Sequence, residues 1–268
     1  MVKKIKMKRT LIVLFILNSL IGYSQHHMFH FPTSIKNGLL ALWEMNEPST
    51  AGICQDATPN DIDLTYFNII NNQTGKLDKS YLYTDVNPLL LCYDSDLLDG
   101  IGSISLISWV YLNDFQTGND YNSIISSRHS TWTTLNKVFK IFLGVKGGTD
   151  QYVSFRVATS TVFAETISPS NSFKETNWVF IAATYDSSSG TLQLYIDGVL
   201  KSGATLSGGG DIQSNTSNNF TVGHGDVDAV TNHWDGYIDQ TGVFNVALTS
   251  SQVTLLYNGD SGIEYINW

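Results

Sequence analysis

The carboxylates of this chain do not follow a spacing that supports hydrolysis. Retaining glycoside hydrolysis needs two carboxyl groups about 5–5.5 Å apart, a separation that alternate acidic residues on a strand supply, and the chain contains no Glu-x-Asp-x-x-Glu run. It also lacks a Gly-x-Ser-x-Gly nucleophile motif. His129, His224 and His233 lie in loop-like contexts without a His-x-x-x-His metal spacing. The sequence therefore predicts no catalytic residues.

Aromatic side chains in loop-like contexts indicate a different chemistry, the binding of a sugar. A saccharide needs an apolar ring face together with nearby hydrogen-bonding groups. The candidate ligand-binding residues are Trp132, Trp234, Tyr121 and His233. Trp234 also heads a strand pattern, so a core position is the alternative interpretation for it. Solvated loop positions are the alternative for the histidines.

Two cysteines, Cys54 and Cys92, are the only thiols in the chain. An even count in an exported protein favours a disulfide, and we expect these two residues to be bonded. Such a bridge would stabilise the fold by roughly 3–4 kcal/mol in the chain-entropy model. Two buried free thiols are the alternative.

The composition excludes several classes of protein. Hydrophobic residues make up 42% of the 268 residues and charged residues only 15%, which is unlike a disordered chain or a coiled coil. The formal net charge is −9, with 15 basic against 24 acidic residues. Five of the basic residues precede residue 10, so the rest of the chain has 10 against 24, a net charge of −14. Such a chain repels phosphate backbones, so we expect no nucleic-acid partner.

The first 24 residues have the pattern of a secretory signal peptide. A basic stretch up to Arg9 precedes the apolar run from Thr10 to Leu17, and Gly22 and Ser24 are small residues before an expected cleavage at Gln25. The apolar run is shorter than the roughly 20 residues of a membrane span. We therefore expect a secreted or periplasmic product without membrane insertion, in which residues 25–37 form a lead-in and residues 38–268 form one domain.

Short β-strands separated by turn residues dominate the predicted domain. The expected strands are rich in β-branched and aromatic residues and are bounded by Gly, Asn, Asp or Ser; they are 39–45, 62–69, 89–93, 104–112, 138–143, 152–157, 178–185, 191–196 and 220–223. The strand 178–185 is apolar on both faces, which predicts a central position. Asp197–Gly198 is typical of a two-residue type I′ hairpin turn.

One helix is predicted, over residues 248–259. Thr249 is a suitable N-cap, and Gln252 three residues later completes a capping box. Gly259 suits the position after the last helical residue. Many short strands with a single helix predict an all-β fold, a two-sheet antiparallel β-sandwich.

The order of these segments resembles the laminin-G-like jelly-roll domain of the concanavalin A-like lectin/glucanase superfamily. Six segments carry the resemblance and cover about residues 38–259; they begin at Gly38, Asp56, Ser105, Trp178, Leu194 and Asp235. The sequence Leu194-Tyr-Ile-Asp-Gly-Val199 is similar to the family pattern LYVDGV. The chain differs from the family at Asn46, Pro59 and Gln240, where Asp, Gly and an acid are usual.

The resemblance implies a structural calcium ion that joins the first and last strands. The positions that match the family's ligands are Asp239, Glu47, Asp56 and Asn46. Calcium prefers six to eight oxygen ligands, and the negative net charge favours a cation. The alternative for Asp239 is that it caps a turn or pairs with a basic side chain.

The resemblance leaves several functions open, because lectins, enzymes and adhesive modules share this scaffold. The expected function is that of an exported, non-catalytic module for an extracellular glycan. The alternatives are a module for a surface protein and, with less support, a divergent polysaccharide hydrolase or lyase.

Overall fold

The computed structural model divides the chain into two units, residues 1–30 and 31–268. It describes residues 33–48, 52–84, 88–92, 100–115, 121–128, 139–147, 151–159, 162–212, 219–225 and 232–263. All of them belong to the second unit. The predicted signal peptide and most of the lead-in lie outside the described residues, whereas the end of the lead-in forms a short helix, α2 (Thr33–Lys36).

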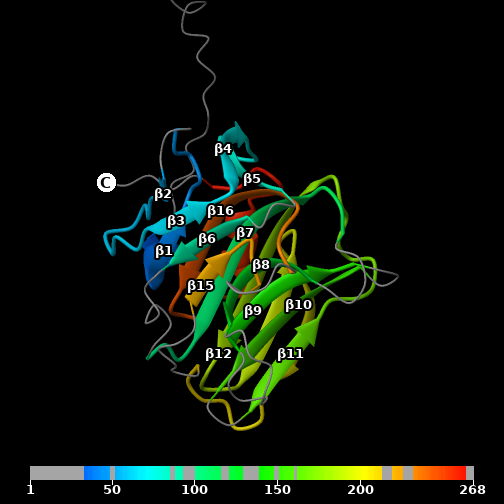
Figure 1. Ribbon diagram of the computed structural model, residues 1–268. Helices are drawn as coiled ribbons and strands as arrows, with labels where there is room; N and C mark the ends of the chain where they lie inside the picture. The colour runs from blue at the N-terminus through cyan, green and yellow to red at the C-terminus, as the bar shows by residue number, and fades with distance from the viewer. Residues whose placement is uncertain are drawn as a thin grey trace, which may run out of the picture. The chain divides into compact units, whose positions relative to one another are not determined.

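Within the described residues, two antiparallel sheets of eight strands each form the domain (Figure 1). Sheet A has the order β14-β13-β12-β7-β16-β5-β4, and β1 pairs with β16 outside this path. Its strands are β1 (Leu39–Trp43), β4 (Ile69–Thr74), β5 (Lys79–Tyr83), β7 (Ile104–Leu112), β12 (Trp178–Asp186), β13 (Thr191–Ile196), β14 (Val199–Thr205) and β16 (Gly236–Phe244).

Sheet B has the order β11-β10-β9-β8-β15-β6-β3-β2. Its strands are β2 (Ile53–Cys54), β3 (Leu64–Phe67), β6 (Leu89–Cys92), β8 (Tyr121–Arg128), β9 (Phe139–Lys146), β10 (Tyr152–Ala158), β11 (Phe163–Ile167) and β15 (Asn219–Val222). The two sheets with one short C-terminal helix confirm the predicted jelly-roll β-sandwich.

The main core lies between the sheets, and a second apolar cluster lies outside sheet A. The central strand β12 shows why both are needed. Its residues Val179 and Ile181 belong to the main core, whereas Phe180 faces the other side and packs in the outer cluster with Val253 and Leu256 of helix α3 (Ser250–Tyr257). The helix therefore covers the outer face of β12, which explains the apolar pattern on both faces of that strand.

The local turn and cap signals of the sequence are confirmed. Asp197 and Gly198 both have positive φ, 51° and 72°, as a type I′ turn requires. Thr249 caps α3, and both hydrogen bonds of the capping box with Gln252 are present.

The segment predicted as one strand over residues 62–69 differs from the structure. It is divided into β3 in sheet B and β4 in sheet A. Asn68, which lies between these strands, has a φ of 53°. Asparagine tolerates this left-handed conformation, so the chain turns there and passes from one sheet to the other.

Among the described residues, no helix is long and apolar enough to cross a membrane.

Candidate functional site

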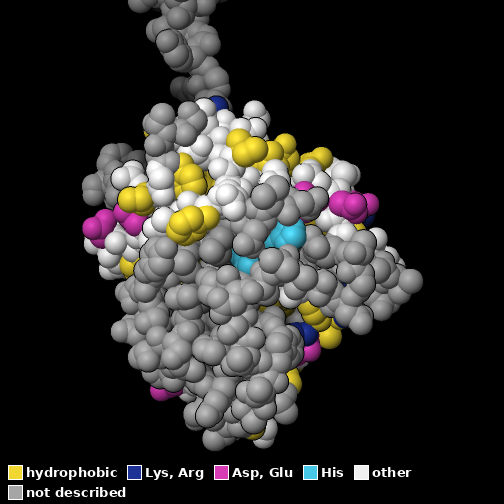
Figure 2. Space-filling model, in the orientation of Figure 1, with side chains coloured by type: hydrophobic (Ala, Val, Ile, Leu, Met, Phe, Trp, Pro, Cys, Tyr) yellow, Lys and Arg dark blue, Asp and Glu magenta, His cyan; other side chains and the backbone are white. Residues whose placement is uncertain are grey.

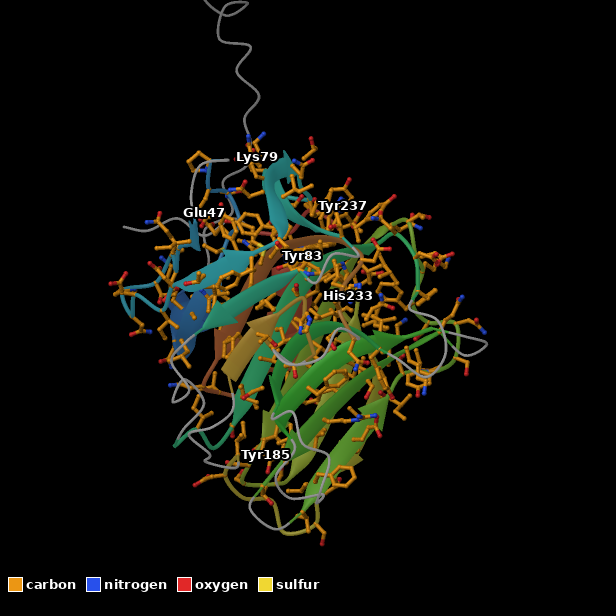
Figure 3. The ribbon with its side chains drawn as sticks, in the orientation of Figure 1. Glu47, Lys79, Tyr83, Tyr185, His233 and Tyr237 are labelled. Atoms are coloured by element: carbon orange, nitrogen blue, oxygen red, sulfur yellow. The ribbon has the colours of Figure 1, made fainter. Side chains whose placement is uncertain are left out.

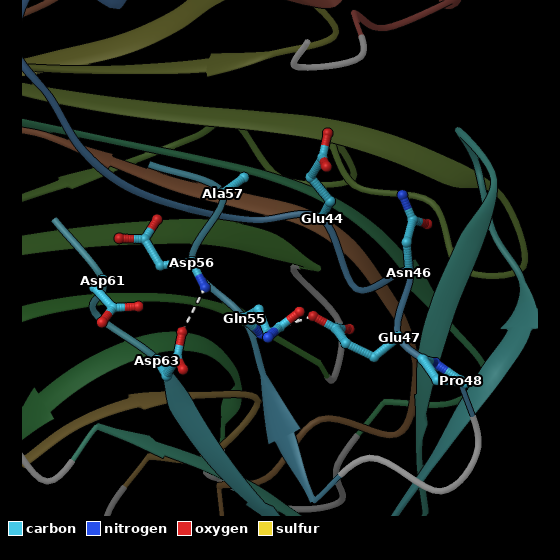
Figure 4. A pocket seen from close by; sticks show the side chains of 9 residues that line it. All are labelled: Glu44, Asn46, Glu47, Pro48, Gln55, Asp56, Ala57, Asp61 and Asp63. Atoms are coloured by element: carbon cyan, nitrogen blue, oxygen red, sulfur yellow. Dashed lines mark hydrogen bonds between the residues drawn. The ribbon is translucent and has the colours of Figure 1, made fainter. Parts of the chain in front are cut away.

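A pocket of about 400 Å³ lies beside the end of β1, and acidic and amide side chains line much of it (Figure 4). The segment that follows β1 supplies one side of the pocket, and the loop between β2 and β3 supplies the other. Five carboxylates line it: Glu44, Glu47, Asp56, Asp61 and Asp63. Figure 2 shows acidic side chains (magenta) gathered at the left edge of the molecule, where Figure 1 places β2 and β3.

Asp56 holds this pocket together through hydrogen bonds to both of its carboxylate oxygens. Its Oδ1 accepts from the backbone N–H groups of Leu42 and Thr58, each at 2.9 Å. Its Oδ2 accepts from the Thr58 hydroxyl at 2.7 Å and from the Ile62 N–H at 3.0 Å. The carboxylate thus connects β1 to the loop before β3 and stabilises the local structure.

Glu47 and Asn46 also have hydrogen-bond partners. Glu47 Oε1 accepts from the Gln55 N–H at 2.7 Å, and Oε2 accepts from the Tyr81 hydroxyl at 2.6 Å. Asn46 Oδ1 accepts from the Lys79 N–H at 3.0 Å. The three predicted metal ligands in this region therefore line one pocket, but their oxygens are engaged with the protein.

Asp239, the fourth predicted ligand, does not line the pocket. It lies on β16 with 1% of its surface exposed, and its Oδ2 accepts from the Leu77 N–H at 2.8 Å. Burial raises the pKa of Asp239 to about 7, against the opposing effect of backbone N–H donors. Within the described part of the chain, no three His, Cys, Asp or Glu side chains gather as a metal-binding group. The four predicted ligands do not converge on one point.

The predicted disulfide is not formed, because Cys54 is a free, buried thiol. The sheet order gives the reason. Cys54 on β2 pairs with Leu64 on β3, and β3 lies between β2 and β6, the strand that carries Cys92. Two interstrand spacings are about 9.6 Å, whereas a disulfide requires Cα atoms within about 7 Å.

The outer face of sheet B carries a cluster of aromatic and charged side chains. On β10, Val153, Phe155 and Val157 belong to the core, so Tyr152 and Arg156 point to the opposite face. There the Arg156 Nη2 donates to the Tyr121 hydroxyl at 2.8 Å, and Nε donates to Glu165 at 2.8 Å. We call Tyr121, Tyr152, Arg156 and Glu165 the tyrosine–arginine cluster.

Tyr121 lies at the centre of this cluster. Its hydroxyl is 3.4 Å from that of Tyr152, and the Arg156 guanidinium and Lys146 ammonium lie 5.0 and 5.2 Å from its ring centre. Burial raises the pKa of the Tyr121 phenol, which therefore keeps its proton and remains a hydrogen-bond donor at neutral pH. The alternation of residues along the strand could have indicated that Tyr152 and Arg156 share its outer face. No sequence motif marked them as binding residues.

The other predicted ligand-binding residues have different positions. Asn232, the neighbour of His233, accepts from the Tyr121 N–H at 2.8 Å, so the backbone of Tyr121 lies near His233, which Figure 3 labels. The rings of His224 and His233 are stacked 6.5 Å apart. Trp234 is completely buried and belongs to the main core, which confirms the alternative interpretation and excludes it as a sugar platform. Trp132 lies outside the described residues.

The laminin-G family model described as the concanavalin A-like lectin/glucanases superfamily matches residues 90–254. No curated protein sequence matches the chain. Among solved structures, the binding domain of botulinum neurotoxin serotype D is similar with a TM-score of 0.62 and 14% identity, over 84% of this chain and 53% of that one. The chain thus spans about half the length of the neurotoxin structures that it matches.

Two further structures share the fold. Domain 4 of AbnA, an extracellular arabinanase from Geobacillus stearothermophilus in complex with arabinotriose, has a TM-score of 0.52 and 18% identity, over 81% of this chain and 96% of that one. Trypanosoma rangeli sialidase in complex with sialic acid has a TM-score of 0.56 and 11% identity, over 85% and 33%. At these identities the likeness concerns the fold alone.

Proposed function

The chain belongs to the concanavalin A-like lectin/glucanases superfamily, and from that premise we propose that it is an exported, non-catalytic glycan-binding protein. The observation that carries the proposal is the tyrosine–arginine cluster on the outer face of sheet B. A similar fold in the arabinanase domain with arabinotriose supports a saccharide as the ligand class. Export is supported by the tripartite pattern of residues 1–24.

The cluster has the groups that a saccharide needs. The phenols of Tyr121 and Tyr152 and the guanidinium of Arg156 can donate hydrogen bonds to sugar oxygens, and the carboxylate of Glu165 can accept them. The edge-to-face contact of Tyr121 with Phe142, with ring centres 5.3 Å apart, holds the central ring in place. A fixed ring loses little conformational freedom on binding, which favours affinity.

Removal of the Arg156 guanidinium should weaken glycan binding at least tenfold, or about 1.4 kcal/mol. We expect Arg156→Ala to show this loss and Arg156→Lys to recover part of the affinity, because the charge remains while the planar fork is lost. The measurement is a glycan array with the full exported chain, followed by titration calorimetry with the best ligand. Lys174→Ala, an exposed basic residue outside the cluster, is the matched control.

The array also separates the alternatives. Unchanged affinity in a folded Arg156→Ala variant would remove the cluster from the binding site. Cell-surface binding that survives enzymatic removal of glycans would favour the surface-protein alternative. Incubation with the bound glycan should release no reducing ends, since the proposed function has no turnover.

We also propose a structural calcium ion at the acidic pocket. Of the expected ligands, Glu47, Asp56 and Asn46 line this pocket, and Glu44, Asp61 and Asp63 lie beside them. Carboxylate oxygens are the ligands that calcium prefers. Because the described side chains do not gather as a metal-binding group, binding would draw these oxygens together around the ion. Calcium at a hundredfold excess over its dissociation constant should stabilise the fold by about 2.7 kcal/mol, seen as a higher melting midpoint than in chelator.

The ligands of this ion can be separated by substitution. We expect Glu44→Gln to reduce the calcium-dependent shift and Asp114→Asn, an exposed acid away from the pocket, to leave it intact. An unchanged shift in Asp239→Asn would remove Asp239 from the ligand set. Equal midpoints in calcium and chelator would contradict the ion altogether.

A further inference from the structure

A line of apolar side chains crosses five strands on the outer face of sheet A. Trp178 on β12 pairs with Tyr111 on β7, and Tyr111 pairs with Tyr237 on β16. The line continues from Tyr237 through Leu82 on β5 to Ile70 on β4. Directly paired residues share one face of a sheet. We call these five residues the aromatic row, after the three aromatic residues at one end of it. With about 4.8 Å between neighbouring strands, the row spans about 19 Å.

The aromatic row lies beside the part of sheet A that α3 covers. Trp109 and Phe180, each two residues away from a member of the row on the same strand, pack with Tyr257 of the helix. In contrast, the members of the aromatic row are partly exposed, and Ile70 is 51% exposed. Hydrophobic side chains are visible near β4 and β5 in Figure 2, and Figure 3 labels Tyr237 in the same region.

The rings of the aromatic row are held rigidly. Tyr111 makes edge-to-face contacts with Trp178 at 5.8 Å and with Tyr237 at 5.6 Å. Beneath them, the Trp234 Nε1 lies 3.2 Å from the carbonyl oxygens of both tyrosines. At Gly236 a Cβ atom would lie 2.0 Å from the Tyr111 oxygen, so only glycine permits this close pairing of β7 and β16.

Polar groups flank the aromatic end of the row. Asn113 follows β7, and its side-chain amide lies 3.3 Å from the Asp235 carboxylate before β16. Rings next to an amide and a carboxylate suit a saccharide, which presents apolar C–H faces and hydroxyl groups. The net charge of −9 and the nearby Asp235 disfavour an acidic polymer.

We propose that the aromatic row is a second binding surface for a neutral oligosaccharide chain, which lies across the strands of sheet A. The ligand stacks on Trp178, Tyr111 and Tyr237 and hydrogen-bonds to Asn113. This surface is on the opposite sheet from the tyrosine–arginine cluster and shares no residue with it. Two surfaces on one chain allow it to bridge polysaccharide strands.

Native affinity electrophoresis of the full chain in gels that contain xylan, arabinan, mannan or mixed-linkage β-glucan tests this proposal. In the gel that retards the wild type, Trp178→Ala and Tyr237→Ala should each weaken binding at least tenfold, and Trp178→Phe should recover part of it. Phe67→Ala, an aromatic residue 42% exposed on β3, is the matched control. Circular dichroism and melting curves establish that each variant is folded.

Fluorescence gives a second readout. Among the described tryptophans, Trp43, Trp109 and Trp234 are fully buried and only Trp178 is partly exposed. The polysaccharide that retards the wild type should shift the emission, and Trp178→Phe should abolish the shift.

The proposals for the two surfaces can be refuted independently of each other. Unchanged retardation in folded Trp178→Ala and Tyr237→Ala variants, with loss in Arg156→Ala, overturns the aromatic row and leaves the proposed function standing. Loss in the row variants alone supports the row and overturns the cluster. If no neutral polysaccharide retards the wild type, the proposal that the aromatic row binds such a chain is wrong. The glycan array remains a separate test of the proposed function.

Discussion

Trp234→Ala should lower the free energy of unfolding by about 3–5 kcal/mol, the range for removal of a buried large aromatic side chain. Trp234 is fully buried in the main core. Its ring contacts Phe173 edge to face at 6.3 Å. The alanine variant leaves a cavity and also removes the donor for the carbonyl oxygens of Tyr111 and Tyr237. Urea denaturation followed by circular dichroism measures the change.

A matched pair of variants sharpens this result. Trp234→Phe keeps a six-membered aromatic ring but loses the five-membered ring with its N–H donor, so it should cost less than the alanine variant. Trp178→Ala changes a partly exposed tryptophan and should cost less still. A loss below about 1 kcal/mol in Trp234→Ala, within the usual range of surface substitutions, would contradict the buried position.

The second large effect is expected for Asp56→Ala, at about 3 kcal/mol. Hydrogen bonds to a charged group contribute about 1.5–3 kcal/mol each when buried, and Asp56 accepts four. It is partly exposed, so the sum is reduced by solvent. The variant leaves the N–H groups of Leu42, Thr58 and Ile62 without this acceptor. Denaturation in the presence of chelator measures the effect on the fold alone.

Two comparisons show whether Asp56 acts through hydrogen bonds or through a metal ion. Asp56→Asn keeps one acceptor oxygen and should lose about half as much stability. Asp114→Ala, at an exposed position, should change little. A loss that occurs with calcium and disappears in chelator would identify Asp56 as a metal ligand and contradict the hydrogen-bond explanation.

The sequence determined the features that depend on neighbouring residues. Thr249 and Gln252 lie within one helical turn, so their side chains predict the start of α3 without knowledge of the rest of the chain. Asp197 and Gly198 likewise predict a hairpin, because they tolerate the positive φ of its turn. The apolar pattern of residues 178–185 predicted a central strand. The ordered motifs then indicated the fold, which the family match and the two sheets confirm.

Only the tertiary structure decided which side chains are neighbours. Cys54 and Cys92 appeared suitable for a disulfide until the sheet order placed β3 between their strands. The sequence left Trp234 open between a loop position and a core position, and the sandwich buries it. Burial depends on what another part of the chain places over a residue, and that information is not local.

The two proposed binding surfaces have the same origin. Tyr121, Arg156 and Glu165 meet because the registers of β8, β9, β10 and β11 align them. The aromatic row combines residues 70 and 178, from strands that are far apart in the chain. A shift of one residue in a register would move each side chain to the opposite face of its sheet. The sequence therefore shows which residue types are present, whereas strand order and register determine which of them form a common surface.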